Sequence, residues 1–262
     1  MWATPPRGKG ILPLRQVAPN AVTATALCFG LTAIRFATLG NWTLAMGCVV
    51  LAGILDGLDG RIARLVKGES RFGAELDSLS DAVLVGVAPT LIVWLWSLKY
   101  LPTFGWVISL SLAVCCALRL ARFNAQIDSV EQPHKSAGFL TGVPAPAGAG
   151  LAMLPLYLWV ITGEEFFRYP AVTAPWVLLV AFLMISNVAT FSWSSLRLRK
   201  NIRLEAIALI ALLTVAIFSN PFIMLAVVSV IYLGCIPFSI NSYRKVRLRA
   251  RSAASPDIAL PS

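Results

Sequence analysis

The stretch FATLGNWTLAMGCVVLAGIL, residues 36–55, carries no charged side chain and ends directly before an acidic residue, Asp56. Its length meets the roughly 18 apolar residues that a helix needs to cross the hydrocarbon core of a bilayer. Further charge-free runs of this kind occupy residues 16–34, 100–118, 136–163, 169–196 and 206–243. Membrane-crossing helices are therefore expected to decide the fold.

The composition of the whole chain agrees with this expectation. Of its 262 residues, 58% are hydrophobic and 13% are charged, whereas a soluble domain carries about 25% charged residues. These figures exclude a water-soluble fold and a disordered chain. A disulfide scaffold is excluded as well, because the five cysteines all lie inside apolar runs.

We predict an all-α fold, a polytopic transmembrane bundle of about eight helices. The run 206–243 is too long for one span, and it is divided before Pro221 because proline cannot continue a hydrogen-bonded helix. The first span is expected to be retained rather than cleaved as a signal peptide. The predicted spans are 18–38, 42–65, 73–98, 103–123, 143–162, 171–192, 203–219 and 221–239.

The distribution of Lys and Arg along the sequence indicates the orientation of the protein in the membrane. The net charge is +10, and most of the 22 Lys and Arg lie near the two termini and at alternate connections between predicted spans. The positive-inside rule places these regions, and both termini, in the cytoplasm. Nucleic acid is not expected as a partner, because the basic residues flank apolar runs, where anionic lipid head groups lie. The predicted organisation is a basic cytoplasmic segment 1–17, a transmembrane domain 18–240 and a basic, disordered cytoplasmic tail 241–262.

The acidic residues are concentrated in one short region. Asp56 and Asp59 are three residues apart and Asp77 and Asp81 are four apart, so each pair shares one face of a predicted helix. The connection between them lets the two helices run antiparallel, so that the faces can meet. Carboxylates at membrane depth are costly, and protons or hard divalent cations such as Mg²⁺ or Mn²⁺ would neutralise them. Six of the 12 acids lie here: Asp56, Asp59, Glu69, Glu75, Asp77 and Asp81.

Basic residues and glycines separate the two acidic pairs. Carboxylates for a metal beside cations for phosphate are what phosphoryl-group chemistry requires, and glycines permit a close backbone approach. From spacing alone, a set of interfacial salt bridges capping two helices remains the alternative. The residues concerned are Arg61, Arg64, Lys67 and Arg71, with Gly57, Gly60, Gly68 and Gly73.

This region resembles the signature of the CDP-alcohol phosphatidyltransferase family. That pattern is D-x₂-D-G-x₂-A-R-x₈-G-x₃-D-x₃-D, and every fixed position is present between Asp56 and Asp81. The resemblance implies a membrane-embedded enzyme, in which a hydroxyl attacks the β-phosphorus of a CDP-linked lipid and CMP is released. It also implies a six-helix core, here with two further helices, and a homodimer.

The resemblance implies roles for individual residues. Asp56, Asp59 and Asp77 would hold one metal ion, and Asp77 and Asp81 would take part in holding a second, with Asp56 able to bridge. Asp81 would also be the general base. The CDP-diacylglycerol moiety would be contacted by Gly60, Arg64, Ser70, Asn20 and Thr23, although an N-cap role for Asn20 or Thr23 is an open alternative.

Beyond the signature, the chain most resembles the membrane-integral phosphatidylserine synthases, the branch of the family with L-serine as acceptor. The supporting segments are SDAV at 80–83, GVAP at 86–89, RLARFN at 119–124 and FLTGVPAP at 139–146. Leu84-Val85 departs from the Ser-Phe that is usual in relatives, which bears on substrate positioning. Because His134 is the only histidine, a covalent mechanism with paired histidine motifs is excluded, and direct displacement is expected.

A serine acceptor would need a cation for its carboxylate. Arg119, Arg122 and Lys135 are the candidates, with positive-inside anchoring as the alternative for the two arginines. Another acceptor, namely glycerol 3-phosphate, an inositol phosphate or choline, is the second hypothesis. An ion-coupled transporter is the third, but it predicts acids on several helices near the bilayer midplane. The expected partners are CDP-diacylglycerol, L-serine and the lipid bilayer, and the expected location is the bacterial inner (cytoplasmic) membrane.

Overall fold

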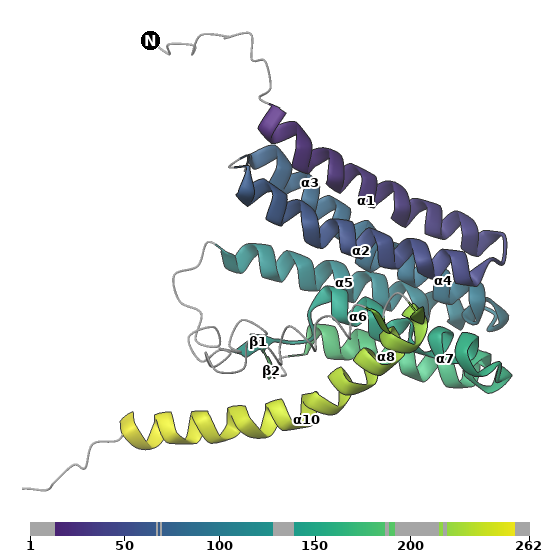
Figure 1. Ribbon diagram of the computed structural model, residues 1–262. Coiled ribbons are helices and arrows are strands. Elements are labelled where there is room, and N and C mark those ends of the chain that lie inside the picture. The colour runs from purple at the N-terminus through teal and green to yellow at the C-terminus, as the bar shows by residue number, and fades with distance from the viewer. Residues whose placement is uncertain are drawn as a thin grey trace, which may run out of the picture. The chain divides into compact units, whose positions relative to one another are not determined.

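The structure of the protein is a computed structural model (Figure 1). It describes residues 14–66, 68, 70–127, 139–186, 189–191, 215, 216 and 219–254. The chain divides into two compact units, Met1–Ile92 and Val93–Ser262. Each unit has its own set of packed helices.

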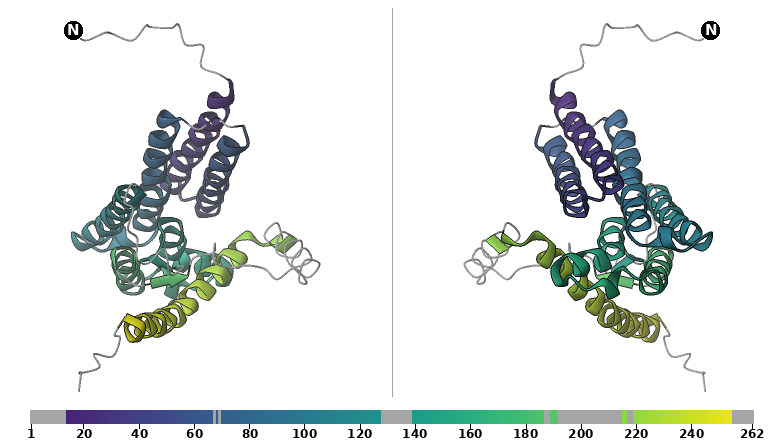
Figure 2. Two further views of the ribbon diagram at one scale, coloured as in Figure 1. Left: turned by 90° about the vertical axis from the view of Figure 1, so that its left-hand side faces the viewer. Right: turned by 90° about the vertical axis from the view of Figure 1, so that its right-hand side faces the viewer.

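The first unit is built on a helical hairpin. Helix α1, Leu14–Thr38, turns at Gly40, whose φ of +75° suits a residue without a side chain, into α2, Trp42–Leu65. Helix α1 also packs against α3, Arg71–Asp81, and Figures 1 and 2 show the three lying side by side. Small residues let membrane helices approach closely, and the buried ones here are Ala26, Ala33, Ala37, Ala45 and Ala52.

A wide helical turn follows α3. The π-helical segment η1, Ala82–Val87, leads into α4, Ala88–Trp96, so that Arg71–Trp96 is one continuous apolar helix. Leu84 of this segment is buried with Ala26 and Ala52. Its side chain lies against Gly30 of α1 and fills the space that a Cβ would take there. The close approach of α1 to the π-helical segment therefore depends on a glycine.

The second unit contains the later helices. Helix α5 packs against α8, and α10 packs against α6 and α7. The strands β1, Phe139–Thr141, and β2, Ala189–Phe191, pair antiparallel with Phe139 opposite Phe191. The helical elements are η2 Leu98–Tyr100, α5 Phe104–Ile127, α6 Ala145–Ala152, α7 Leu154–Thr162, η3 Glu165–Arg168, α8 Pro170–Ile185 and α10 Pro221–Ala254.

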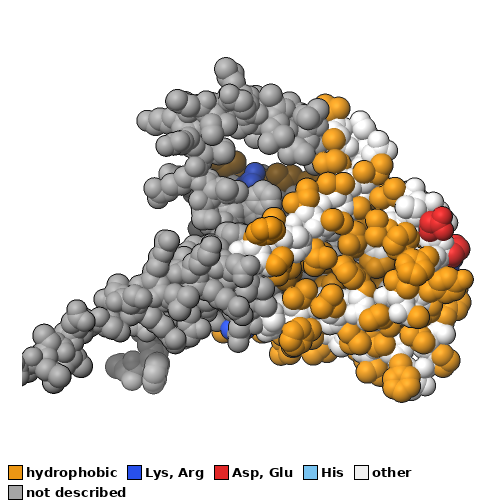
Figure 3. Space-filling model, turned by 90° about the horizontal axis from the view of Figure 1, so that it is seen from below, with side chains coloured by type: hydrophobic (Ala, Val, Ile, Leu, Met, Phe, Trp, Pro, Cys, Tyr) orange, Lys and Arg blue, Asp and Glu red, His pale blue; other side chains and the backbone are white. Residues whose placement is uncertain are grey.

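The described helices confirm a helical, multi-pass membrane protein. Six of them are long and apolar enough to span a bilayer, and α8 is a shorter apolar helix. Hydrophobic side chains cover most of the described surface in Figure 3, as expected where lipid replaces water. The spans are Val17–Thr38, Trp42–Leu65, Arg71–Trp96, Phe104–Ala125, Ala145–Thr162 and Pro221–Ser239.

Several predicted boundaries were wrong. The predicted span 143–162 is confirmed as the span Ala145–Thr162, although its helix is interrupted at Met153, because Pro155 lacks the N–H that a continuous helix would use. The predicted span 171–192 ends at Ile185 and gives way to β2. Helix α1 already begins at Leu14, inside the segment assigned to the N-terminal arm.

The C-terminal boundary differs as well. Helix α10 continues to Ala254, so residues 241–254 are helical where a disordered tail was predicted. Lys, Arg, Leu and Ala predominate there and are good helix formers, so the helix outlasts its apolar stretch. Most of the predicted span 203–219 lies outside the described residues.

Candidate active site

The two acidic pairs meet within the first unit. Asp56 and Asp59 come from the last turns of α2, and Asp77 comes from α3. Each of these three side chains offers a carboxylate oxygen, and the three oxygens lie within 4.8 Å of one another. The expectation that the two helix faces would meet is confirmed.

Asp81 completes the group of four carboxylates. It is the last residue of α3, and its half-buried side chain lies within hydrogen-bonding reach of Asp56. The Oδ1 atom of Asp56 is buried and has no hydrogen-bond partner. A buried carboxylate oxygen without a partner is costly, and a proton or a bound cation would stabilise it.

The surroundings of the carboxylates decide between a metal and salt bridges. Among the described residues of the first unit, no Lys or Arg forms an ion pair with these acids, which removes the support for the salt-bridge alternative. Three hard oxygen donors this close together and an unpartnered Asp56 Oδ1 are a donor set that fits a divalent cation.

Asp59 is the most enclosed of the four. It is only 4% exposed, and its Oδ1 accepts a hydrogen bond of 2.5 Å from the Gly60 N–H. Its Oδ2 accepts a hydrogen bond of 2.5 Å from the Thr23 hydroxyl of α1, which is also buried. The sequence pointed to Thr23 as a nucleotide contact, but it did not reveal this bond between helices.

Asn20 lies one turn before Thr23 on the same helix. Both residues are inside α1, which begins at Leu14, so the N-cap alternative for them was wrong. The Asn20 Oδ1 lies 2.8 Å from the point that a Cβ on Gly73 would occupy. Absence of a side chain at Gly73 is therefore what lets Asn20 reach the first turn of α3.

Ser70 meets Asn20 at the same place. It is the N-cap residue of α3, and its Oγ accepts a hydrogen bond of 3.0 Å from the Gly73 N–H. The point where a Gly73 Cβ would lie is 3.2 Å from this Oγ. Asn20 and Ser70 thus present their polar atoms together at the N-terminus of α3, where the helix dipole favours anions.

Gly60 and Arg64 lie on the exposed side of α2. A Cβ at Gly60 would meet nothing within 4 Å, so packing alone does not demand glycine there. The Arg64 Nε donates to the Gly60 carbonyl at 3.1 Å, which holds the exposed guanidinium over the same turn. This leaves open space for a ligand beside a fixed cation.

The residues expected to bind the acceptor alcohol lie in the second unit or outside the described residues. Arg119 of α5 is 9% exposed, its Nε donates to the Val143 carbonyl at 3.3 Å, and its guanidinium lies over the Phe123 ring. This burial does not fit an anchor that extends to the lipid surface. Arg122 is exposed, and Lys135 lies outside the described residues.

A membrane-embedded helical protein with four converging carboxylates, none of which forms an ion pair with a described Lys or Arg, is typical of an enzyme that handles metal-bound phosphates. Comparison with known families agrees, because the model for CDP-alcohol phosphatidyltransferases matches residues 16–236. The chain belongs to the CDP-alcohol phosphatidyltransferase family. It is accordingly a membrane transferase of phospholipid biosynthesis.

Curated relatives carry a more specific name. A CDP-diacylglycerol--serine O-phosphatidyltransferase of Mycobacterium tuberculosis is 38% identical over 91% of this chain and 83% of its own length. Proteins of the same name from Helicobacter pylori and Bacillus subtilis are 33% and 31% identical. The alignments cover 82% and 65% of this chain, and 87% of each relative.

Proposed function

We propose that the protein transfers a phosphatidyl group from CDP-diacylglycerol to the hydroxyl of L-serine and releases CMP. The observation that carries this proposal is the convergence of the signature carboxylates, with a buried Asp56 oxygen that has no partner. The names of the relatives support serine as the acceptor.

The proposed cofactors are two Mg²⁺ or Mn²⁺ ions. Asp56, Asp59 and Asp77 would hold one, and Asp77 and Asp81 would take part in holding the second. When bound, such ions neutralise the phosphate oxygens and the charge that develops on the leaving group. The Thr23 hydroxyl and the Gly60 N–H keep both oxygens of Asp59 in a fixed orientation, which favours a preformed ligand set.

Asp81 is the proposed general base. Its carboxylate accepts the hydroxyl proton of serine, while the serine oxygen forms a bond to the β-phosphorus. The bond from that phosphorus to the oxygen of the CMP group breaks, and CMP leaves with this oxygen. Asp56, within hydrogen-bonding reach of Asp81, helps to orient the base.

The nucleotide would lie along the exposed ends of α2 and α3. Arg64 supplies positive charge to the diphosphate, and Gly60 leaves room for it. Asn20 and Ser70 supply polar contacts at the N-terminus of α3, where their side-chain oxygens meet beside Gly73. Thr23 acts through Asp59, in addition to any contact with substrate.

For the serine carboxylate, Arg119 is the favoured partner among Arg119, Arg122 and Lys135. A buried guanidinium with one N–H already fixed on a carbonyl loses little freedom when it binds an anion. Leu84-Val85 stands where relatives usually have Ser-Phe. Leu84 has a packing role, because its side chain lies in the core against Gly30.

The test uses the full-length chain in detergent with CDP-diacylglycerol, labelled serine and Mg²⁺ or Mn²⁺. Labelled phosphatidylserine and CMP are expected in equal amounts. Asp81→Asn should abolish transfer, whereas Glu75→Gln, at an exposed acid of the same helix, should retain it. Release of CMP with glycerol 3-phosphate, an inositol phosphate or choline, but not with serine, would overturn the assignment of serine as the acceptor. Normal turnover by Asp81→Asn would overturn the assignment of Asp81 as the general base.

The proposed location is the inner (cytoplasmic) membrane of a bacterium, with the active site and both termini on the cytoplasmic side. The asymmetric distribution of Lys and Arg supports this orientation. We also propose a homodimer. Labelling of single introduced cysteines with a membrane-impermeant reagent in intact cells and in inverted vesicles tests the orientation, and cross-linking in membranes tests the dimer.

A further inference from the structure

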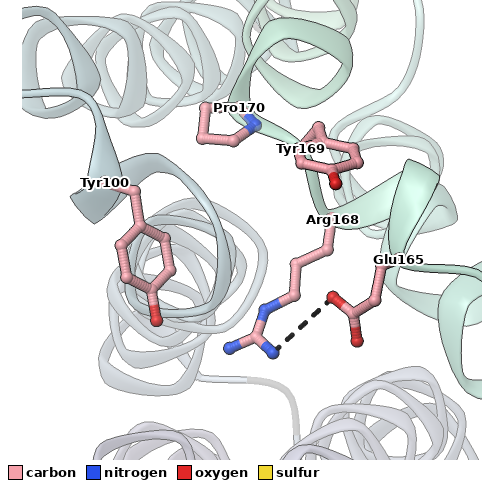
Figure 4. Close-up of a pocket in the computed structure, with 5 residues that line it drawn as sticks. All are labelled: Tyr100, Glu165, Arg168, Tyr169 and Pro170. Atoms are coloured by element: carbon pink, nitrogen blue, oxygen red, sulfur yellow. Dashed lines mark ion pairs between the residues drawn. The ribbon is translucent and has the colours of Figure 1, made fainter.

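A second polar site lies in the second unit, among the short connections between its helices. A cavity of about 390 Å³ is lined by Tyr100, at the end of η2, by Glu165 and Arg168 of η3, and by Tyr169 and Pro170, where α8 begins. Figure 4 shows the Arg168 guanidinium extending between the Tyr100 ring and the Glu165 carboxylate. None of these residues belongs to the family signature.

Arg168 is held in place by neighbours that leave its outer nitrogens available. Its Nε donates to the Trp96 carbonyl at 3.2 Å, and its guanidinium lies 5.5 Å from the Trp159 ring and 6.0 Å from the Tyr100 ring. Its own carbonyl accepts a hydrogen bond from the buried Ser97. The arginine is therefore oriented before any ligand arrives.

Glu165 is oriented separately. Its Oε1 accepts a hydrogen bond of 3.1 Å from the Trp159 indole N–H. The distance from its Oε2 to the Arg168 Nη1 is 4.0 Å, longer than the 2.7–2.9 Å of a strong charge-assisted hydrogen bond. Two opposite charges thus lie side by side without neutralising each other by a tight pair, an arrangement that suits a ligand with one charge of each sign.

The position of the cavity residues along the chain indicates which class of ligand is available to them. The cavity residues follow the ends of two spans, Arg71–Trp96 and Ala145–Thr162. Aromatic residues gather around these ends, including the edge-to-face pair Trp94–Trp106 and Trp159 against Trp96. Such belts mark the level of the lipid head groups, so a ligand there is presented by the bilayer itself.

We propose that this cavity binds the head group of a zwitterionic phospholipid that carries a phosphodiester and a primary ammonium. The phosphodiester pairs with Arg168. The ammonium pairs with the Glu165 carboxylate, beside the arginine.

The test is direct binding to the full-length chain in detergent, measured by titration calorimetry. The probes are dihexanoyl phosphatidylethanolamine, dihexanoyl phosphatidylglycerol, which lacks the ammonium, and free phosphoethanolamine, which lacks the acyl chains. Tighter binding of the phosphatidylethanolamine than of either other probe is expected. Equally tight binding of free phosphoethanolamine would overturn the proposal of a lipid ligand and would indicate a soluble ligand.

Substitutions separate this cavity from other lipid sites. Glu165→Gln keeps an acceptor for Trp159 but removes the charge, so it should weaken phosphatidylethanolamine binding about tenfold and leave phosphatidylglycerol binding unchanged. Arg168→Gln should weaken binding of both lipids. Glu164→Gln, at an exposed acid outside the cavity lining, should change neither. Unchanged phosphatidylethanolamine binding by Glu165→Gln would overturn the proposal, whatever the chain's transferase activity.

Discussion

The hydrogen bond from Thr23 to Asp59 allows a direct test of how α1 supports the proposed metal site. Thr23→Val keeps the shape of the side chain and removes the hydroxyl that lies 2.5 Å from the Asp59 Oδ2. Both residues are 4% exposed, so water cannot readily replace the lost donor. Loss of a partner that orients a metal ligand typically lowers metal affinity by roughly 10–100-fold, so affinity for the metal should fall about thirtyfold.

The assay is binding of Mn²⁺ to the full-length chain in detergent, followed by the loss of the free-ion electron paramagnetic resonance signal. Thr25→Val is the matched control, because Thr25 is an exposed residue of the same helix whose hydroxyl donates only to the Ala21 carbonyl at 2.7 Å. Thr23→Ser, which retains the hydroxyl, should restore most of the affinity. A Thr23→Val protein that binds Mn²⁺ within twofold of the wild type would refute the reasoning.

Three further outcomes are expected. Gly73→Ala should displace Asn20, whose Oδ1 lies 2.8 Å from the added Cβ, and raise the KM for CDP-diacylglycerol more than it lowers kcat; an unchanged KM would contradict this. Gly30→Ala should lower the free energy of unfolding by about 1–3 kcal/mol through overpacking against Leu84, and Leu84→Ala in the same chain should recover part of the loss, as thermal unfolding would show. Removal of divalent ions with EDTA should lower the melting temperature, because ions that bind only the folded state stabilise it; Asp56→Asn should make the melting temperature insensitive to EDTA.

The proposed site was largely predictable because it depends on local spacing. Asp56 and Asp59 at three residues, and Asp77 and Asp81 at four, determine which helix face each pair occupies. The short connection then requires the two helices to be neighbours. These constraints were sufficient to predict that the carboxylates converge, whereas the identity of the bound ions remains a proposal.

Other features depend on contacts between distant residues, and the sequence did not predict them. The Thr23–Asp59 bond requires the rotation of α1 about its own axis, which hydropathy does not define in a span with apolar residues on all sides. The end of α8 at Ile185 could not be predicted from the charge-free run 169–196. Charged residues define where such a run begins and ends, but they do not define the backbone conformation inside it.

The π-helical segment Ala82–Val87 also sets the angular phase of the long helix that contains it. If the same residues were wound as a regular α-helix, the wide turn would be lost and everything beyond it would be rotated by roughly 100°, the angle of one residue. Buried Thr90 and Ile92 would then swing toward the acyl chains while α3 stayed in place. Anyone grafting the four acids onto a different helical scaffold would have to transplant this irregular turn along with them.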